Sequence, residues 1–90
     1  MEFSYRDEGP LRIIDVTGTM AAGTAGVCER IIAKMKRKGV KSIKLDLTGV
    51  KQITGSGLGM VSTLRAAAQK RDLDFAVTGF EGRVASLFRS

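Results

Sequence analysis

The 90-residue sequence contains no histidine and no tryptophan, and it has one cysteine and one proline. Without histidine, the chain cannot build a Ser-His-Asp triad, a Cys-His nucleophile pair or a histidine metal ligand. The lone cysteine, Cys28, cannot form an internal disulfide, and an unpaired thiol is typical of a reducing compartment. The sequence therefore predicts a protein that is not an enzyme and that uses no metal or other cofactor.

Long hydrophobic runs are also missing. No stretch reaches about 18 apolar residues, so we expect no membrane span. The N-terminal segment MEFSYRDEG is polar and does not have the apolar core of a signal peptide. A hydrophobic fraction of 43% with mixed charges is typical of a globular protein, and 90 residues suit one small domain. We therefore expect a single domain over residues 1–90, located in the cytoplasm.

Acidic residues are outnumbered by basic ones, and the formal net charge is +6. A basic balance can indicate a nucleic-acid partner. The five aromatic residues, however, are scattered and do not interleave with basic residues as a base-stacking platform would. The densest basic cluster falls at the end of a predicted helix, where cations complement the helix dipole; it consists of Lys34, Lys36, Arg37, Lys38 and Lys41. We interpret it as solvated surface or as a patch for an acidic protein, and not as a nucleic-acid groove.

Two strand patterns open the chain. Apolar and polar residues alternate over Glu2 to Asp7, which predicts an edge strand. Near-continuous apolar residues over Leu11 to Val16 predict a strand covered on both faces. The intervening turn contains Pro10, which cannot donate to a sheet ladder, so the two strands are predicted to form an antiparallel hairpin.

A helix pattern follows from Ala25 to Lys38, where apolar residues recur at positions i, i+3, i+4 and i+7. Gly39 is predicted to end this helix. Cys28 falls on the apolar stripe, so we interpret it as a small core residue.

The second half repeats the alternation of strand and helix. Period-two patterns predict strands over Ile43 to Thr48 and Leu73 to Val77. Helical spacing predicts a helix from Ser56 or Gly57 to Lys70 and a short terminal helix over Glu81 to Phe88. The predicted architecture is α/β: a small mixed sheet of about four strands, the first antiparallel and the rest parallel, with about three packed helices.

Asp46 alternates outward from an apolar strand, and no acidic cluster gathers near it in the sequence. It is therefore predicted to be a solvated or turn-bonding aspartate and not a magnesium ligand.

A glycine-rich turn opens the second long helix, in the run Thr54-Gly55-Ser56-Gly57-Leu58-Gly59. A dinucleotide fingerprint would need a third glycine or an alanine where Met60 stands, and a P-loop would need Gly-Lys-Ser/Thr. With both motifs excluded, the turn presents two hydroxyls at a helix N-terminus. Thr54 or Ser56 can accept a hydrogen bond as the N-cap while the other faces solvent, where the helix dipole favours an anion such as an attached phosphate.

The run Leu45-Asp46-Leu47-Thr48-Gly49-Val50, followed by this turn, resembles the STAS domain family, whose best-known members are bacterial anti-sigma factor antagonists. That family typically has Asp-Leu-Ser-Gly-Val at the end of a strand and then Asp-Ser-Ser-Gly-Leu-Gly at the start of a helix. The resemblance implies a binding module that regulates transcription by partner switching. Such a module binds an anti-sigma factor that is also a serine kinase. Phosphorylation of the module disrupts the complex, and a PPM-type phosphatase restores binding.

The sequence departs from the family pattern at its most informative point. Thr54 stands in place of the aspartate, Gly55 in place of the usual acceptor serine, and Ser56 matches the second serine. The candidates for phosphorylation are therefore Ser56 and Thr54. The residues expected to contact a partner are Thr54, Gly55, Ser56, Gly57, Leu58 and Met60. The alternative implied by the resemblance is a constitutive accessory subunit that docks on the ATPase of an ABC transporter.

Overall fold

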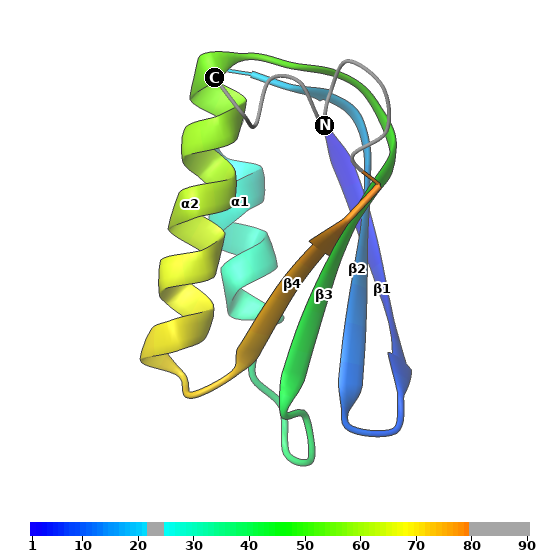
Figure 1. Cartoon of the computed structure of the whole chain (residues 1–90), viewed down its shortest axis with the longest axis vertical. Helices are drawn as coiled ribbons and strands as arrows, with labels where there is room; N and C mark the ends of the chain where they lie inside the picture. Colours follow the sequence, from blue (N-terminus) through cyan, green and yellow to red (C-terminus); the bar gives the residue numbers. More distant parts are fainter. Residues whose placement is uncertain (22–24, 80–90) are drawn as a thin grey trace.

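The computed structural model describes residues 1–21 and 25–79, which form one four-stranded sheet with two helices on one face (Figure 1). The strands are β1 (Glu2–Glu8), β2 (Leu11–Met20), β3 (Ser42–Ile53) and β4 (Asp74–Thr78). The helices are α1 (Ala25–Ala33) and α2 (Gly55–Lys70). The predicted third helix, over Glu81 to Phe88, lies outside the described residues.

The strand order is β1-β2-β3-β4, with β1 antiparallel to β2 and the other pairs parallel. This confirms the predicted mixed α/β sheet. Each parallel pair is joined by a helix, and such crossovers are right-handed in nearly all proteins. Because both crossovers step across the sheet in the same direction, α1 and α2 lie on the same face and run side by side (Figure 1).

The core lies between this face of the sheet and the two helices. Ile14 of β2 and Leu45 of β3 are adjacent in the sheet, and both are fully buried. Ile31 of α1 and Leu64 of α2 are also fully buried. Cys28 belongs to the same apolar cluster, which confirms its predicted role as a small core residue.

Arg12 is the charged residue buried among the described positions, with a side chain that is 3% exposed. Its guanidinium donates to both carboxylate oxygens of Asp7 on β1, at 2.7 and 2.9 Å, and to the carbonyl oxygen of Lys34, at 2.6 Å. It also lies over the ring of Tyr5, 4.4 Å from the centroid. One side chain on β2 therefore joins the edge strand to the chain that follows α1.

The predicted end of α1 is wrong: the helix ends at Ala33 and not at Lys38. The amides of Lys34 and Met35 bond to carbonyls three residues back, as in a tightened last turn. The Lys34 carbonyl, which would serve the next helical turn, accepts a hydrogen bond from Arg12 instead. Gly39, with φ of +92°, lies in the turn that follows and does not end the helix.

β2 and β3 are longer than predicted. β2 continues past Val16 to Met20, and β3 continues past Thr48 to Ile53. The register between them shifts at Asp15/Thr17 and again at Gly18/Thr19. Past Leu47, the buried positions of β3 fall at every third residue, namely Leu47, Val50 and Ile53. A spacing of three is neither the strand period nor the helix period, so the sequence pattern hides the last part of this strand.

Candidate functional site

The candidate site lies at the junction of β3 and α2, where buried Ile53 is followed by the half-buried Thr54. Thr54 has extended backbone angles, φ −96° and ψ 176°, and is the N-cap of α2. Its hydroxyl oxygen accepts a hydrogen bond from the Gly57 amide at 3.2 Å. Of the two N-cap candidates in the sequence, the structure therefore selects Thr54.

The same threonine ties the helix start to the end of β2. The Thr54 amide donates to the Met20 carbonyl at 2.9 Å, and the Thr54 hydroxyl lies 3.3 Å from that oxygen. The Thr54 carbonyl accepts the first helical bond, from Leu58, at 2.9 Å. The turn is thus held by the ends of two adjacent strands.

Gly57 is buried where α2 crosses the end of β2. A Cβ placed on Gly57 would overlap the Met20 carbonyl oxygen and would lie 2.8 Å from Cγ1 of Ile53. Only glycine lets the helix approach so closely. Gly57 therefore positions the turn, and its predicted contact with a partner stays a prediction.

Gly55 and Ser56 are exposed on the first turn of α2, and Leu58 and Met60 are half-buried against the core. Among the described residues, no hydrogen-bond partner is found for the Ser56 hydroxyl, and nothing lies within 4 Å of a Cβ built on Gly55. Gly59, which was not among the predicted contacts, is exposed beside them. The structure brings five of the six predicted residues, all except the buried Gly57, together at the surface of one helix start, with the exposed Ser56 hydroxyl among them.

The electrostatics of this turn favour an anion. The first turn of α2 has no acidic residue, and the N-terminal end of a helix carries a partial positive charge of about half a unit. Ser56 is the second helical residue, where an attached phosphate would be within reach of that charge. The pairing of a capped terminus with a free, exposed hydroxyl suits a modification site.

Asp46 and Cys28, the other candidates for chemistry in the sequence, have structural roles. Asp46 accepts hydrogen bonds from the Thr48 amide and hydroxyl, at 2.9 and 2.6 Å, and these hold the pKa of Asp46 below its usual value. The predicted local bonding of Asp46 is present, although it lies within β3 and not in a turn. Burial raises the pKa of the Cys28 thiol, which keeps it protonated and a poor nucleophile.

Within residues 1–21 and 25–79, no three His, Cys, Asp or Glu side chains are grouped to hold a metal ion. In the same residues, neither helix has the length and apolar character needed to cross a membrane.

The family model for the STAS domain matches residues 3–90. The chain belongs to the STAS domain family. A comparison with curated protein sequences finds no match.

Solved structures with the same fold include two anti-sigma factor antagonists. The STAS chain is 12% identical to SpoIIAA in its unphosphorylated form, with a TM-score of 0.71 over 98% of this chain and 82% of SpoIIAA. It is 20% identical to an anti-sigma factor antagonist from Mycobacterium paratuberculosis, with a TM-score of 0.72 over 98% of this chain and 76% of that one.

A sulfate transporter family protein from Wolinella succinogenes is 16% identical, with a TM-score of 0.74 over 89% of this chain and 65% of that chain. The STAS chain also matches part of a longer protein, Mglu, and spans 18% of its length. At these identities the likenesses show the fold alone.

Proposed function

We propose that this STAS domain is a non-enzymatic protein-interaction module that acts as an anti-sigma factor antagonist does. The observation that supports it best is the exposed Ser56 hydroxyl on a helix start that Thr54 caps, within a fold shared with two such antagonists. Its partner is a kinase-type anti-sigma factor or a related regulator. Because such a partner uses ATP, the pair acts in the cytoplasm.

The contact surface is the turn Thr54 to Met60 and the exposed side of α2 up to Leu64. Gly55, Ser56 and Gly59 supply exposed backbone and one hydroxyl, while the half-buried Leu58 and Met60 supply apolar area. Small residues let a partner approach the helix start closely, and apolar side chains at the centre of an interface contribute most of its affinity.

Ser56 is the proposed phosphate acceptor, and Thr54 is not. The Thr54 hydroxyl is occupied by Gly57 and Met20, so phosphorylation there would break the N-cap. Phosphorylation of Ser56 breaks no hydrogen bond among the described residues and adds about −1.5 to −2 charges at the centre of the contact surface. A complex that buries this turn would then dissociate, and a PPM-type phosphatase would restore it.

The test is to incubate the protein with the kinase-type anti-sigma factor of its own genome and ATP, and to locate phosphate by mass spectrometry. We expect one phosphate on Ser56 and none in Ser56→Ala. The variant Gly55→Ser restores a hydroxyl at the usual acceptor position, where the structure has space for a side chain. Phosphate on Gly55→Ser but not on the wild type would refute Ser56 as the acceptor while leaving the contact surface intact.

A second candidate is a constitutive accessory subunit that docks on a transporter ATPase. Two observations favour it: Gly55 has no hydroxyl, and the fold is shared with a sulfate transporter family protein. In a pull-down from its own organism, recovery of a transporter ATPase without any sigma-factor regulator would support this candidate against the first.

A further inference from the structure

A second surface lies between the two helices, towards their C-terminal ends. It is a shallow groove of about 350 Å³ lined by Ile32, Thr63, Ala66, Ala67, Lys70 and Arg71. The lining residues of α2 recur at i, i+3, i+4 and i+7, so they share one face of that helix. Because the centre of this face is two alanines, the space that longer side chains would fill beside Ile32 is open.

The floor of the groove is apolar and its rim is basic. Ala67 is buried and Ile32 is half-buried, whereas Ala66 and Lys70 are exposed. The Thr63 hydroxyl donates to the Gly59 carbonyl of its own helix, at 3.0 Å. The floor therefore offers apolar contact, and the charged groups stand at its end.

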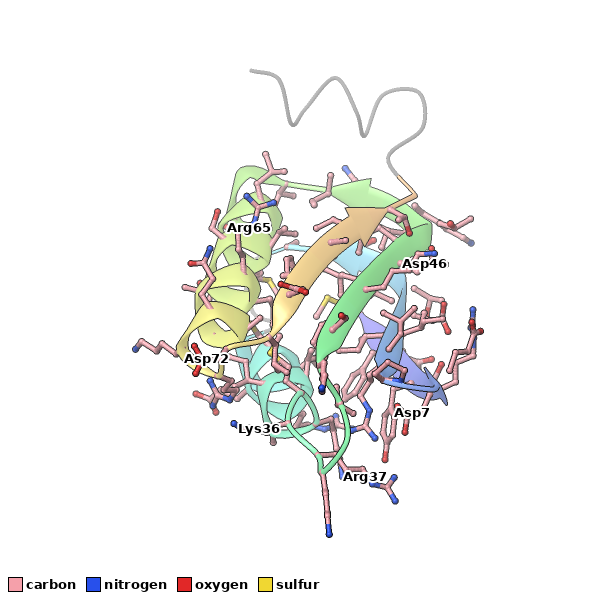
Figure 2. The ribbon with its side chains drawn as sticks, turned by 60° about the horizontal axis from the view of Figure 1, so that its bottom comes forward. Asp7, Lys36, Arg37, Asp46, Arg65 and Asp72 are labelled. Atoms are coloured by element: carbon pink, nitrogen blue, oxygen red, sulfur yellow. The ribbon has the colours of Figure 1, made fainter. Side chains whose placement is uncertain are left out.

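Charge is distributed unevenly over the described part of the chain, and the helical segments with the loop after α1 carry the positive excess. Segments 25–41 and 55–71 contain a single acidic residue, Glu29. The basic residues of these segments are Arg30, Lys34, Lys36, Arg37, Lys38, Lys41, Arg65, Lys70 and Arg71. Figure 2 shows Lys36 and Arg37 in the loop beyond α1, at the end of the molecule where α2 also terminates next to Asp72.

These basic residues carry more positive charge than is needed to balance the helix dipoles. The two helix C-termini together carry a partial charge of about −1, which a single cation would neutralise. One of the basic residues, Arg71, also donates to the Ala67 carbonyl at 2.9 Å. Even with the opposing charge of Asp72, this end of the helical face has a net positive charge that a partner can use.

We propose that the groove between α1 and α2 binds an acidic amphipathic helix of a partner protein. The stretch from Thr63 to Lys70 is about 10 Å long, which matches two turns of a helix. Two apolar side chains of such a helix would lie over the alanines, and its carboxylates would meet Lys70, Arg71 and the loop after α1. This is the helix-in-groove mode, with charge complementarity selecting the partner.

Two other basic-surface ligands fit less well. A membrane surface would need an exposed apolar side chain to insert, and the large exposed apolar residue in the described part of the chain is Tyr5 of β1, away from the groove. A single-stranded nucleic acid would need aromatic side chains on which its bases stack, and the groove has none.

The groove is separate from the turn at the start of α2. Its centre lies about ten residues along the helix from Ser56, or about 15 Å. The two surfaces meet at Thr63, but the centre of the groove lies beyond the proposed contact surface, and the groove does not depend on the proposed antagonist function.

The test measures fluorescence anisotropy of a labelled 18-residue probe peptide binding to the whole chain. The probe repeats apolar residues at i, i+3 and i+7 with glutamate elsewhere, and a scrambled probe keeps the composition without the apolar stripe. We expect the amphipathic probe to bind at least about tenfold more tightly than the scrambled one, a difference of about 1.4 kcal/mol.

Ala66→Gln fills the groove with a polar side chain on an exposed helical position, and Lys70→Glu reverses a rim charge. Each should weaken probe binding about tenfold or more. The matched control is Lys44→Glu, the same charge reversal on the sheet face opposite the helices. This control should bind as the wild type does, and circular dichroism checks that every variant is folded.

Equal binding of the two probes would refute the groove, because charge alone would then account for the affinity. Equal losses in Lys44→Glu and Lys70→Glu would refute it as well, as would no detectable binding of the wild type at low salt. Phosphatidylserine vesicles and a generic oligonucleotide are tested as competitors of the labelled probe. If either displaces the probe at a lower concentration of charge than unlabelled probe does, the surface binds that ligand instead.

Discussion

Thr54 and Ser56 stand two residues apart and have different roles. The Thr54 hydroxyl bridges the Gly57 amide and the Met20 carbonyl, so it stabilises the junction of β2, β3 and α2. The Ser56 side chain faces outward from the next helical position. The proposed phosphorylation of Ser56 would therefore change the charge of this surface while the Thr54 cap keeps the helix start in place.

Gly57 and Gly59 lie on the same helix, but replacing each by alanine should have opposite effects on the free energy of unfolding. Gly57→Ala should lower the free energy of unfolding by about 1–3 kcal/mol, because its Cβ meets the Met20 backbone. Gly59→Ala, at an exposed position with open space, should raise it by about 0.5–1 kcal/mol. Urea unfolding of both variants measures the difference. A Gly57→Ala variant as stable as Gly59→Ala would show that the close approach to β2 is wrong.

Thr48 should control the titration of Asp46. Its amide and hydroxyl lower the pKa of Asp46, so the stabilisation from these bonds is present above the unfolded value of 3.8 and is lost as the pH falls through the folded pKa. In Thr48→Val, which removes the hydroxyl donor, the pKa of Asp46 should rise, as NMR titration of its side chain would record. The stability difference between the two proteins should shrink in acid, and a difference that grows there would contradict this assignment.

At the scale of elements, Arg12 adds polar bonds between parts of the fold that the apolar core also joins. It connects β2 to Asp7 of the edge strand and to the Lys34 carbonyl beyond α1. A second arginine-aspartate pair, Arg6 with Asp15 at 2.6 Å, is as short but lies on the exposed side of the sheet. Arg6 makes one hydrogen bond to Asp15, whereas the buried Arg12 makes two to Asp7 and one to a carbonyl, so the comparison separates an exposed pair from a buried network.

Arg12→Ala should therefore lower the free energy of unfolding by about 2–4 kcal/mol, because it leaves a carbonyl and a carboxylate without their donor. Arg6→Ala should lower it by less than about 1 kcal/mol, since exposed pairs contribute little. Thermal or urea unfolding gives both values. Similar losses in the two variants would mean that Arg12 contributes no more than a surface ion pair.

The boundaries of the elements were less predictable than their order. Alternation predicted β3 up to Thr48, but the bulges against β2 change the burial period to three, and the strand continues to Ile53. The end of α1 depends on Arg12, which is distant in sequence from the Lys34 carbonyl it binds. Local pattern cannot supply such contacts, because they exist only once the sheet and the helix have packed together.

At the scale of the whole molecule, the fold could be predicted from the sequence, because strand and helix periods alternate clearly and two crossovers allow few topologies. The sequence also located the turn of Thr54 to Met60. The division of roles within that turn needed three dimensions, since the burial of Gly57 depends on Met20 and the cap could have been Thr54 or Ser56. The groove could not be predicted from the sequence, because neither helix pattern alone shows which residues of α1 lie beside which residues of α2.

Two surfaces along α2 give the molecule a simple organisation. The sheet and core hold the helix, the turn at its N-terminal end carries the free hydroxyl, and the basic groove lies towards its C-terminal end. The two proposed surfaces would let this small domain bring two partners together, with phosphorylation of Ser56 controlling one of the two contacts.

The most direct test of the contact surface is the dissociation constant for the kinase-type anti-sigma factor of the same genome, measured by calorimetry without ATP. The variant Ser56→Asp adds one negative charge at the turn, and Gln69→Glu adds one at an exposed position near the other end of α2. We predict that Ser56→Asp binds at least about tenfold more weakly than the wild type, while Gln69→Glu is unchanged. A Ser56→Asp variant that binds as tightly as the wild type would contradict the account.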